Sequence, residues 1–364
     1  MNKRIGLVIH SGANLFSNGI TQNAWFIYEC LRECGYSCEF LCNEPYPKPF
    51  AFKEIVLRSF AYDFPYHEYL AIITITKNIS VEQYMQFHRL TIPVISFVCG
   101  NHFMMDLEQF IWSKTAGPIL KKSQVADAIW IIPSFYYSAL YLETLHGIPV
   151  FEIPHLWSPQ LLEHRALTLS KVQPSSLYFK LKNYSKFNII IMEANISLSK
   201  NAVLGLTVAE YIYKRYPAMI NRVYLANLPN NDMAKKFIEN LTVPIIVQQT
   251  YKEMDEILLM VSNDEAMPIF LCNQLFHSLN YVYYECFYYG YPLVHNSLSL
   301  DGCGYYYPDC DVEKSAQAVL EAFRNHTKKL HQYNEDGRTY LERVNPYSKD
   351  VQNKWTTMIT SVLT

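Results

Sequence analysis

The 364-residue sequence contains no uninterrupted apolar run that approaches the roughly 18 residues required for a membrane-spanning helix. Its amino-terminal apolar stretch is too short for a signal peptide, and no small-residue cleavage site follows it. These absences argue against an integral membrane protein and against a secreted precursor. We therefore expect a soluble protein of the cytoplasm, or of the host cytoplasm if the chain is viral.

The sequence also lacks an excess of charge of either sign. Its formal net charge is −2 and its pI is about 6.6. This balance excludes a generally basic protein that coats DNA. It leaves room for a local basic cleft, because net charge says little about a focused site.

The nine cysteines do not form a metal motif, although Cys30, Cys34, Cys38 and Cys42 recur every four residues. The first two can share a helix face, but Gly35 ends that helix. The last two then fall on a following strand, about 13 Å apart at the usual rise. Four ligands cannot converge on one ion from these positions without distortion. We expect free thiols in a reducing compartment and no bound metal.

The length of the chain favours two domains, because single cores seldom grow beyond roughly 250–300 residues. In the first half, short apolar strands alternate with helical patterns, which is typical of βαβ units and a parallel sheet. The predicted strands are residues 5–9, 37–41, 70–74, 94–98, 128–132 and 150–153. The predicted helices are residues 21–33, 81–89, 106–112 and 134–145.

A stretch with Pro and Ser, residues 154–186, interrupts this alternation and reads as an interdomain connection. Beyond it we predict strands at 188–192, 223–226, 243–247, 268–271 and 292–294, and helices at 201–215, 232–240, 251–261, 281–289, 311–326 and 347–363. The fold class is therefore α/β, with two Rossmann-like doubly wound domains facing a cleft. We place the first domain at residues 1–170 and the second at 171–346, with helix 347–363 packing back on the first.

The segment YVYYECFYYGYPLVHNS, residues 281–297, gives the strongest indication of a ligand site. A short helix carries Glu285, ends at Gly290 and leads into a strand that finishes in His295, Asn296 and Ser297. Ligands of parallel α/β sheets bind at the carboxyl ends of strands. A lone carboxylate there suits the paired hydroxyls of a ribose, so we predict a nucleotide-sugar site.

The first strand is followed by a loop that contains Ser11, Gly12, Asn18 and Gly19. Its glycines permit close backbone approach, and the helix that follows favours an anion or a polar sugar at its start. The loop lacks the spacings GxGxxG and GxxxxGK[ST], so neither a dinucleotide fold nor a P-loop is supported. We predict a sugar or acceptor loop, with a simple tight turn as the alternative.

A second loop, at the start of the second domain, contains Glu193, Asn195 and Lys200. Lys200 lies near a predicted helix start and can neutralise a diphosphate, with backbone amides as further donors. Glu193 is predicted at the tip of the strand. The alternative is a capped helix with a solvated lysine.

Two further strand ends carry polar residues. His102 follows the strand at 94–98 and can act as a general base or bind a sugar hydroxyl, with Asp106 one turn later as a weaker candidate. His277 and Ser278 follow the strand at 268–271 and can meet the phosphates. The loop 301–309, rich in Gly and Tyr, can close over a base or a sugar. A structural histidine, a polar loop and packed tyrosines are the respective alternatives.

Four segments together resemble a poorly characterised family of glycosyltransferase-like proteins from bacteria and phages, which is similar in layout to the two-Rossmann class called GT-B. They are KRIGLVIHSGANLFSNGITQNAWF, SLSKNAVLGLTVAE, YYECFYYGYPLVHNS and GYYYPD. The resemblance implies a nucleotide-diphosphate sugar held by the second domain and an acceptor bound to the first. It gives Lys200 the place of the phosphate-binding basic residue and Glu285 that of the ribose-binding carboxylate. The arginine usual ahead of the lysine is absent.

The expected activity is therefore transfer of a sugar from a nucleotide-diphosphate sugar to a hydroxyl acceptor, without a cofactor. In this fold no metal is needed, because helix dipoles and cationic side chains stabilise the departing diphosphate. Some members of the resembling group glycosylate modified bases in phage DNA, including hydroxymethylcytosine. Lys180, Lys182 and Lys186, with aromatic residues between them, can hold a nucleic-acid backbone, or can be a solvated linker.

Three alternatives stay open from the sequence. The acceptor can be a glycan, a lipid or a protein in place of DNA. The chain can be a non-catalytic module that binds a nucleotide or a sugar. It can also be a two-domain epimerase with this layout, which would turn over a nucleotide sugar without an acceptor.

Overall fold

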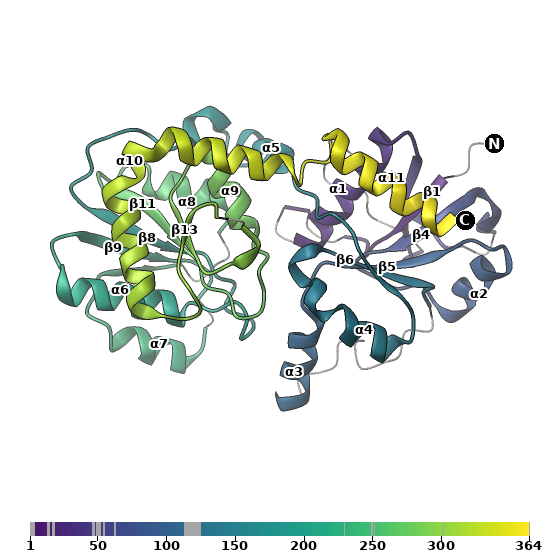
Figure 1. The fold of residues 1–364 in the computed structure, drawn as a ribbon, viewed down its shortest axis with the longest axis horizontal. Helices are drawn as coiled ribbons and strands as arrows, with labels where there is room; N and C mark the ends of the chain where they lie inside the picture. The colour runs from purple at the N-terminus through teal and green to yellow at the C-terminus, as the bar shows by residue number, and fades with distance from the viewer. Residues whose placement is uncertain are drawn as a thin grey trace. The chain divides into compact units, whose positions relative to one another are not determined.

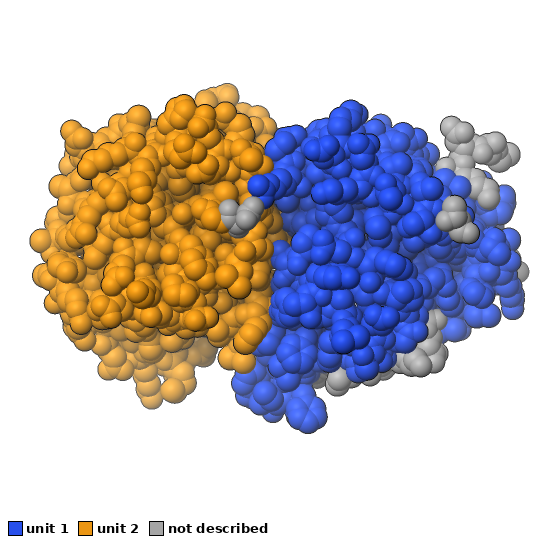
Figure 2. Space-filling model, in the orientation of Figure 1, with its two compact units in different colours: residues 1–158, 342–364 blue, residues 159–341 orange. Residues whose placement is uncertain are grey.

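The structure is a computed structural model that describes residues 4–12, 15–16, 19–45, 48, 52–53, 55–61, 63–112, 125–228, 230–248, 250, 252–300 and 302–363. The chain forms two compact units (Figure 2). The first comprises residues 1–158 and 342–364, and the second comprises residues 159–341.

The first unit is built on a seven-stranded parallel sheet with the order β3-β2-β1-β4-β5-β6-β7 (Figure 1). Its central strands are almost wholly buried, as expected for a parallel sheet with helices on its faces. The strands are β1 Arg4–Val8, β2 Ser37–Cys42, β3 Arg58–Ser59, β4 Tyr69–Thr74, β5 Val94–Val98, β6 Ala128–Ile131 and β7 Val150–Glu152.

The C-terminal helix α11 (Lys349–Leu363) belongs to this first unit, where it contacts α1. Its Trp355 is fully buried and lies 5.9 Å from the ring of Trp130 and 6.4 Å from that of Phe97. The last helix therefore completes the core of the domain that begins the chain. The other helices here are α1 Gly19–Glu33, α2 Val81–Arg89, α3 His102–Trp112 and α4 Ala139–His146, with 3₁₀ turns η1 Tyr66–Glu68 and η3 Pro133–Ser138.

The second unit contains a six-stranded parallel sheet with the order β10-β9-β8-β11-β12-β13. The chain builds this sheet outward from β8 to β10, then returns to β11 beside β8 and continues in the opposite direction. The strands are β8 Phe187–Ile191, β9 Ile220–Leu225, β10 Ile245–Val247, β11 Met267–Leu271, β12 Leu293–His295 and β13 Tyr305–Tyr306. The reversal lies between β8 and β11, which is the point where such folds bind ligands.

The helices of the second unit are α5 Gln160–Thr168, α6 Val203–Arg215, α7 Asp232–Glu239, α8 Met254–Val261, α9 Tyr281–Tyr289 and α10 Val312–Glu342, with 3₁₀ turns η4 Pro174–Leu177 and η5 Leu298–Leu300. Within the ranges described above, no helix is long and apolar enough to cross a membrane.

The prediction of an α/β protein with two doubly wound parallel sheets is confirmed. Three details differ from the sequence expectations. The stretch read as a connection contains α5, so that the second unit begins at residue 159. The helix expected to end at residue 326 continues to Glu342. The two-residue strands β3 and β13 were not expected.

Candidate functional site

The candidate site lies in the second unit, at the carboxyl ends of β8, β11 and β12. Parallel sheets bind ligands at this edge, beside the point where the strand order reverses. All the donor-site residues predicted from the sequence lie on the loops after these strands, at the end of β12 or on α9. They are Glu193, Asn195, Lys200, His277, Ser278, Glu285, His295, Asn296 and Ser297.

Glu193 lies just after β8 and is buried. Its carboxylate accepts a hydrogen bond from the backbone N–H of Asn273 at 3.2 Å and another from the side-chain amide of Gln274 at 3.3 Å. Burial raises the pKa of Glu193 to about 7, and the charge of nearby Lys200 limits that rise. These contacts tie the loop after β8 to the loop after β11, so the carboxylate serves the scaffold of the site.

Asn195 shapes the loop that carries Lys200. Its backbone is in the left-handed region, with φ of 54°. Its side-chain amide donates to the carbonyls of Glu193 at 2.9 Å and Asn227 at 3.2 Å, and its Oδ1 accepts from the backbone N–H of Ala202 at 2.8 Å. The loop is thereby closed on itself directly before α6. Lys200 stays half-buried there, beside the positive end of the α6 dipole.

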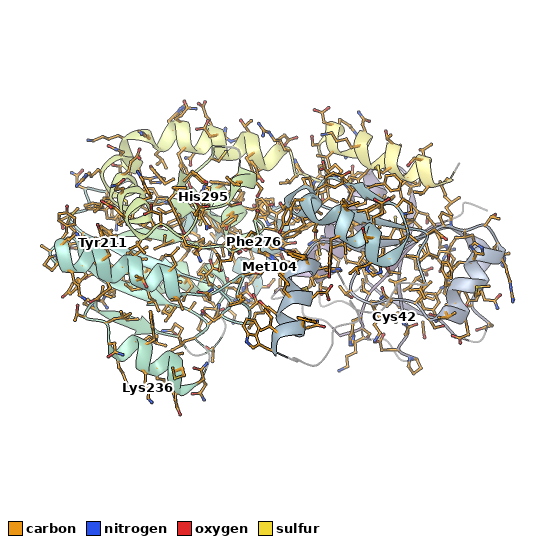
Figure 3. All side chains as sticks on the ribbon, turned by 60° about the horizontal axis from the view of Figure 1, so that its bottom comes forward. Cys42, Met104, Tyr211, Lys236, Phe276 and His295 are labelled. Atoms are coloured by element: carbon orange, nitrogen blue, oxygen red, sulfur yellow. The ribbon has the colours of Figure 1, made fainter. Side chains whose placement is uncertain are left out.

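His277 lies in the loop after β11, next to the strongly exposed Phe276 (labelled in Figure 3). Burial lowers the pKa of His277 to about 2, and the charge of Lys200 lowers it further. The imidazole is therefore neutral at pH 7 and can serve as a hydrogen-bonding group but not as a cation. The backbone N–H of Leu275 donates to the carbonyl of Ser199 at 3.2 Å, so the loop after β11 that carries His277 is joined to the loop after β8 that carries Lys200.

The polar end of β12 is occupied by contacts within the protein. His295 (labelled in Figure 3) is buried, its Nε2 donates to the carbonyl of Cys303 at 2.8 Å, and its Nδ1 accepts from the N–H of Ser297 at 3.1 Å. Burial lowers its pKa to about 4, which keeps the ring neutral. Ser297 Oγ donates to the carbonyl of Ser278 at 2.8 Å.

Asn296 joins three loops at this strand end. Its side chain donates to the carbonyls of Gln274 at 2.8 Å and Asp309 at 2.7 Å, and it accepts from the N–H of Gln274 at 2.8 Å. His295, Asn296 and Ser297, predicted as donor ligands, thus also hold this strand end and its neighbouring loops together. In the same region, Tyr307 is buried and donates to the carbonyl of Cys272 at 2.8 Å, so this tyrosine packs under the site. Residue 301, the start of the loop predicted to cover a base or a sugar, lies outside the described residues.

Gly304 provides a direct test of this scaffold. Its φ is +77°, and a Cβ there would lie 2.9 Å from Nε2 of His295 and 3.1 Å from the carbonyl oxygen of Leu293. We expect Gly304→Ala to lower the free energy of unfolding by about 1–3 kcal/mol, from both strain and steric overlap. Gly302 has a similar φ of +82° but open space around its Cβ position, so Gly302→Ala is the matched control. Equal losses in the two variants, measured by chemical denaturation, would contradict the steric argument.

Glu285 lies on α9 and is half-buried. Burial raises its pKa to about 8, the negative charge of Asp255 adds to the rise, and Arg165 opposes it. None of the described residues donates a hydrogen bond to this carboxylate. The side chain predicted to hold a ribose is therefore not used by the scaffold.

Arg165 on α5 is a cation that influences Glu285, but its bonds go to other carboxylates. Its Nε lies 2.8 Å from the fully buried carboxylate of Asp255, and its terminal nitrogen lies 2.6 Å from that of Glu256. Lys252 also pairs with Glu256, at 3.1 Å. The two cations thus neutralise Asp255 and Glu256 and leave Glu285 without a direct ion pair.

Glu253, which the sequence analysis did not single out, is a second carboxyl of this kind. It caps α8 and exchanges backbone and side-chain hydrogen bonds with Glu256. Its Oε1 is buried and has no hydrogen-bond partner among the described residues. Burial raises its pKa to about 8, and the Glu285 charge contributes to the rise. The Glu-x-x-Glu spacing at a helix start was the available signal, but it indicates a capping box and not a ligand site.

His102 and Asp106, the two residues predicted as candidate general bases, lie on α3 next to residues of α4. Asp106 on α3 is buried and accepts a hydrogen bond from the hydroxyl of Tyr141 at 2.6 Å. Burial raises its pKa. Burial also lowers the pKa of His102 to about 4, and the nearby His146 lowers it further. His102 is thus a neutral imidazole at the start of α3, whereas Asp106 is a hydrogen-bonded carboxyl between two helices.

The loop after β1 is described in part. Ser11 Oγ accepts from the backbone N–H of Lys48 at 2.8 Å, and Gly12 has a φ of 80°. Gly19 begins α1. Asn18 lies outside the described residues. Ser11 therefore shapes the loop, whereas Gly12 is exposed at its surface.

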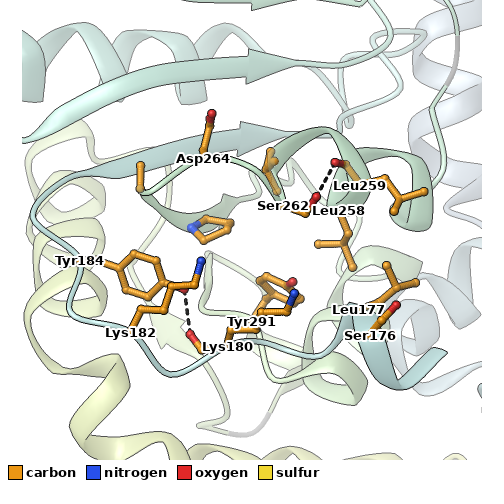
Figure 4. Close-up of a pocket in the computed structure, with 13 residues that line it drawn as sticks. Ser176, Leu177, Lys180, Lys182, Tyr184, Leu258, Leu259, Ser262, Asp264 and Tyr291 are labelled. Carbon is orange, nitrogen blue, oxygen red and sulfur yellow. Dashed lines mark hydrogen bonds between the residues drawn. The ribbon is translucent and has the colours of Figure 1, made fainter. Parts of the chain in front are cut away.

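The lysines predicted to hold a nucleic-acid backbone lie near the amino-terminal ends of strands of the second sheet. The candidate site lies at the carboxyl ends of these strands. Lys180 and Lys182 line a pocket of about 140 Å³ near the amino-terminal end of β11, with Tyr184 and Tyr291 among its walls (Figure 4). Lys186 is not among the residues that line this pocket. Its backbone carbonyl accepts a hydrogen bond from the N–H of Met267, the first residue of β11. Of the neighbouring aromatic rings, Phe179 is buried against Tyr291 and His326, whereas Tyr178 is exposed and lies against Tyr288 and Tyr289.

Among the described residues, no three His, Cys, Asp or Glu side chains are arranged to hold a metal ion, and all nine cysteines are free thiols. The chain contains one Asp-x-Asp spacing, at Asp309 and Asp311. Asp311 caps α10, where its carboxylate accepts from the N–H of Lys314 at 2.9 Å.

Solved structures with a similar fold include glycosyltransferases. The UDP-forming α,α-trehalose-phosphate synthase of Burkholderia vietnamiensis has a TM-score of 0.63 and 12% identity, over 99% of this chain and 97% of that chain. HepE of Anabaena, in complex with UDP and glucose, has a TM-score of 0.57 and 12% identity, over 99% and 100%. An α-glucosyltransferase in complex with UDP and a 13-mer DNA containing an HMU base has a TM-score of 0.57 and 10% identity, over 100% of both chains.

These likenesses establish the fold, which is that of the GT-B glycosyltransferases. No curated protein matches the sequence. Residues 4–359 match the model of the family described as "Protein of unknown function (DUF2827)", and the chain belongs to that family.

Proposed function

We propose that this protein is a glycosyltransferase that moves a sugar from a nucleotide-diphosphate sugar to a hydroxyl acceptor. The observation that carries the proposal is the arrangement at the switch point of the second sheet. Lys200 and the neutral His277 lie on two joined loops at the ends of β8 and β11, and the adjoining helix α9 carries Glu285, to which no described residue donates a hydrogen bond. The likeness of the fold to enzymes solved with UDP supports it.

The diphosphate is assigned to Lys200 and to the amino-terminal end of α6. An ammonium group and the positive end of a helix dipole both stabilise negative charge that develops on a leaving phosphate. His277 adds a neutral hydrogen-bonding group beside the lysine. This set can support departure of the diphosphate without a metal ion.

The ribose is assigned to Glu285. An ionised carboxylate can accept two hydrogen bonds, which matches the two adjacent hydroxyls of a ribose. These hydroxyls would supply the donors that no described residue gives to Glu285. Hydrogen bonds to a charged group contribute more than those between neutral groups, so this contact should be a large part of the nucleotide affinity.

The acceptor hydroxyl is assigned to the first unit, with His102 or Asp106 as the base that removes its proton. We propose the hydroxymethyl group of a modified DNA base as this acceptor, because one enzyme with a similar fold was solved with DNA containing an HMU base. The test is transfer of radiolabelled sugar to DNA with and without an HMU base. Label on glycans, lipids or proteins, but not on DNA, would assign the acceptor to one of those classes.

Glu285→Ala tests the donor site. We expect at least one of UDP, GDP, ADP and CDP to raise the melting temperature of the protein, and the variant to bind that nucleotide about 10- to 100-fold more weakly. Glu321 on α10 is exposed and pairs with Lys329, so Glu321→Ala is the matched control and should bind like the original protein. An unchanged nucleotide affinity in Glu285→Ala would remove the ribose assignment.

Catalysis is tested separately from binding. Slow hydrolysis of the cognate nucleotide sugar without an acceptor would support a transferase. A protein that binds the nucleotide sugar and never releases the sugar would be a binding module. Interconversion of the sugar without transfer would identify an epimerase.

A further inference from the structure

The second unit has a pocket that the proposed donor site does not use. It lies near the start of β11, whereas the candidate site lies at the carboxyl ends of β8, β11 and β12. Its volume is about 140 Å³, which is room for one small molecule. Its walls come from η4, the segment that follows η4, the end of α8 and the start of β11 (Figure 4).

Two lysines line this pocket from one short segment. Lys180, Lys182 and Tyr184 are lining residues, whereas Leu181 between them is 67% exposed. Alternate residues of an extended chain point to the same side, so both lysines reach into the pocket together (Figure 4). Among the described residues, neither ammonium group forms an ion pair with an acid. Both positive charges are therefore available to a ligand.

Tyr291 contributes a hydroxyl to the same pocket. The residue is only 8% exposed, and its ring packs edge-to-face against Phe179 and Phe270. Its hydroxyl has no hydrogen-bond partner among the described residues, yet it is not sealed off from solvent, and it points towards the middle of the lining side chains (Figure 4). Because an unpaired hydroxyl in a buried place is costly, this group favours a ligand with acceptor oxygens.

The other polar groups of the pocket are already bonded within the protein. The carboxylate of Asp264 accepts hydrogen bonds from two neighbouring side chains, at 2.8 and 2.7 Å, and it points away from the lysines (Figure 4). The hydroxyls of Ser176, Ser262 and Tyr184 each donate to a backbone carbonyl, at 2.7, 2.8 and 2.8 Å. The remaining lining residues are apolar apart from the lysines and Tyr291: Leu177, Leu258, Leu259, Val261, Ala266 and Pro268. The free donors thus face an otherwise apolar pocket.

We propose that this pocket binds a small phosphomonoester that carries a short hydrocarbon chain. Its two ammonium groups match the charge of about −2 of such a phosphate, and the Tyr291 hydroxyl supplies one further donor to its oxygens. The apolar walls match the hydrocarbon part, because burial of apolar surface is favourable. A phosphodiester of a nucleic acid carries a single charge and would leave one ammonium group unmatched. This site does not depend on the proposed function.

The test compares methyl phosphate, n-butyl phosphate and butyrate by isothermal titration calorimetry on the whole protein. We expect n-butyl phosphate to bind at least about tenfold more tightly than methyl phosphate, since each buried methylene group contributes about fourfold. Butyrate, which has one negative charge, should bind about tenfold more weakly than n-butyl phosphate. Equal affinities of the two phosphates would overturn the proposal, and so would butyrate binding as tightly as n-butyl phosphate or the absence of any binding.

Three variants locate the bound phosphate. Lys180→Gln and Lys182→Gln should each weaken the binding of n-butyl phosphate by about 5- to 20-fold. Tyr291→Phe removes only the hydroxyl and should weaken it by about 3- to 10-fold. Lys186→Gln changes an exposed lysine of the same segment that does not line the pocket, so it is the matched control and should bind like the original protein.

Melting temperatures close to that of the original protein verify that the variants fold. If the lysines only complement the negative end of the α8 dipole, their variants would melt earlier and bind n-butyl phosphate unchanged, which would overturn the proposal. Weaker binding of n-butyl phosphate in Lys200→Ala would assign it to the donor site in place of this pocket. Displacement of n-butyl phosphate by a short single-stranded DNA would assign the lysines to nucleic acid and would also overturn the proposal.

Discussion

Replacement of Lys200 by alanine is expected to lower the rate of sugar transfer by about 10²–10³-fold, which is the usual effect of removing one preorganised group that stabilises developing charge. Lys200 is half-buried directly before α6, on a loop that is joined to the loop carrying the neutral His277. Lys200 is therefore the cation that the loops at this strand end bring to a departing diphosphate. Release of the nucleoside diphosphate, measured with and without acceptor, reports the effect.

Two further variants make this result specific. Lys200→Arg retains the charge and should keep a substantial part of the activity, although its planar group fits the lysine's place imperfectly. Lys214 lies on the last turn of α6, where it pairs with Glu210 at 3.3 Å, and Lys214→Ala should transfer sugar at the original rate. If Lys200→Ala kept more than about a third of the activity, another group would have to neutralise the leaving phosphate.

The fold could be predicted because its strands and helices have strong local patterns. Strands such as β5 and β11 are short apolar runs, and parallel sheets produce this pattern because both faces are buried. The strands β3 and β13 have only two residues each, which is too short for a repeating hydrophobic pattern to be recognised in the sequence. The α5 helix was missed because its surroundings are rich in Pro and Ser, although Pro159 stands at its N-cap, where proline is tolerated.

The sequence indicates which strand ends carry the polar residues of the candidate site, but it does not indicate which contacts those side chains make. Strand ends were identified from the sequence, and Lys200, His277 and Glu285 do lie on the elements that follow β8 and β11. The use of each polar side chain could not be predicted, because it depends on contacts between loops far apart in the sequence. Asn296 bonds to Gln274 and Asp309, and Glu193 bonds to Asn273, through tertiary contacts alone. Glu253 was missed for the same reason.

Replacement of both Glu253 and Glu285 by glutamine is expected to stabilise the protein above neutral pH. Each carboxyl has its pKa raised from 4.5 to about 8 in the folded protein. Between these two values the folded state binds more protons than the unfolded state, so the stability of the original protein falls as the pH rises through this window. The groups that face the pair are Arg165, Asp255, Glu256 and, on α9, Tyr289.

The gain at pH 8.5 should be about 2 kcal/mol for each carboxyl, since one pKa unit corresponds to about 1.4 kcal/mol and partial exposure to water screens part of the shift. At pH 4.5 both side chains are protonated in the folded state, and the variant should gain far less. Thermal melting at the two pH values measures this difference, and Glu321→Gln, an exposed carboxyl of the same unit, should show no such dependence. Equal effects at both pH values would mean that the two carboxyls are ionised and well compensated in the fold.

The same double variant should bind the nucleotide more weakly although it folds more stably. This contrast between stability and affinity is the reason to expect a ligand at these residues. Two half-buried acids that weaken the fold at neutral pH contribute nothing to the core that glutamine could not supply. A ligand that donates hydrogen bonds favours their ionised form, so its affinity should rise as the pH increases from 6 towards 9. A nucleotide affinity that falls over this range would show that the protonated carboxyls are the binding form, and would assign them the opposite role of hydrogen-bond donors.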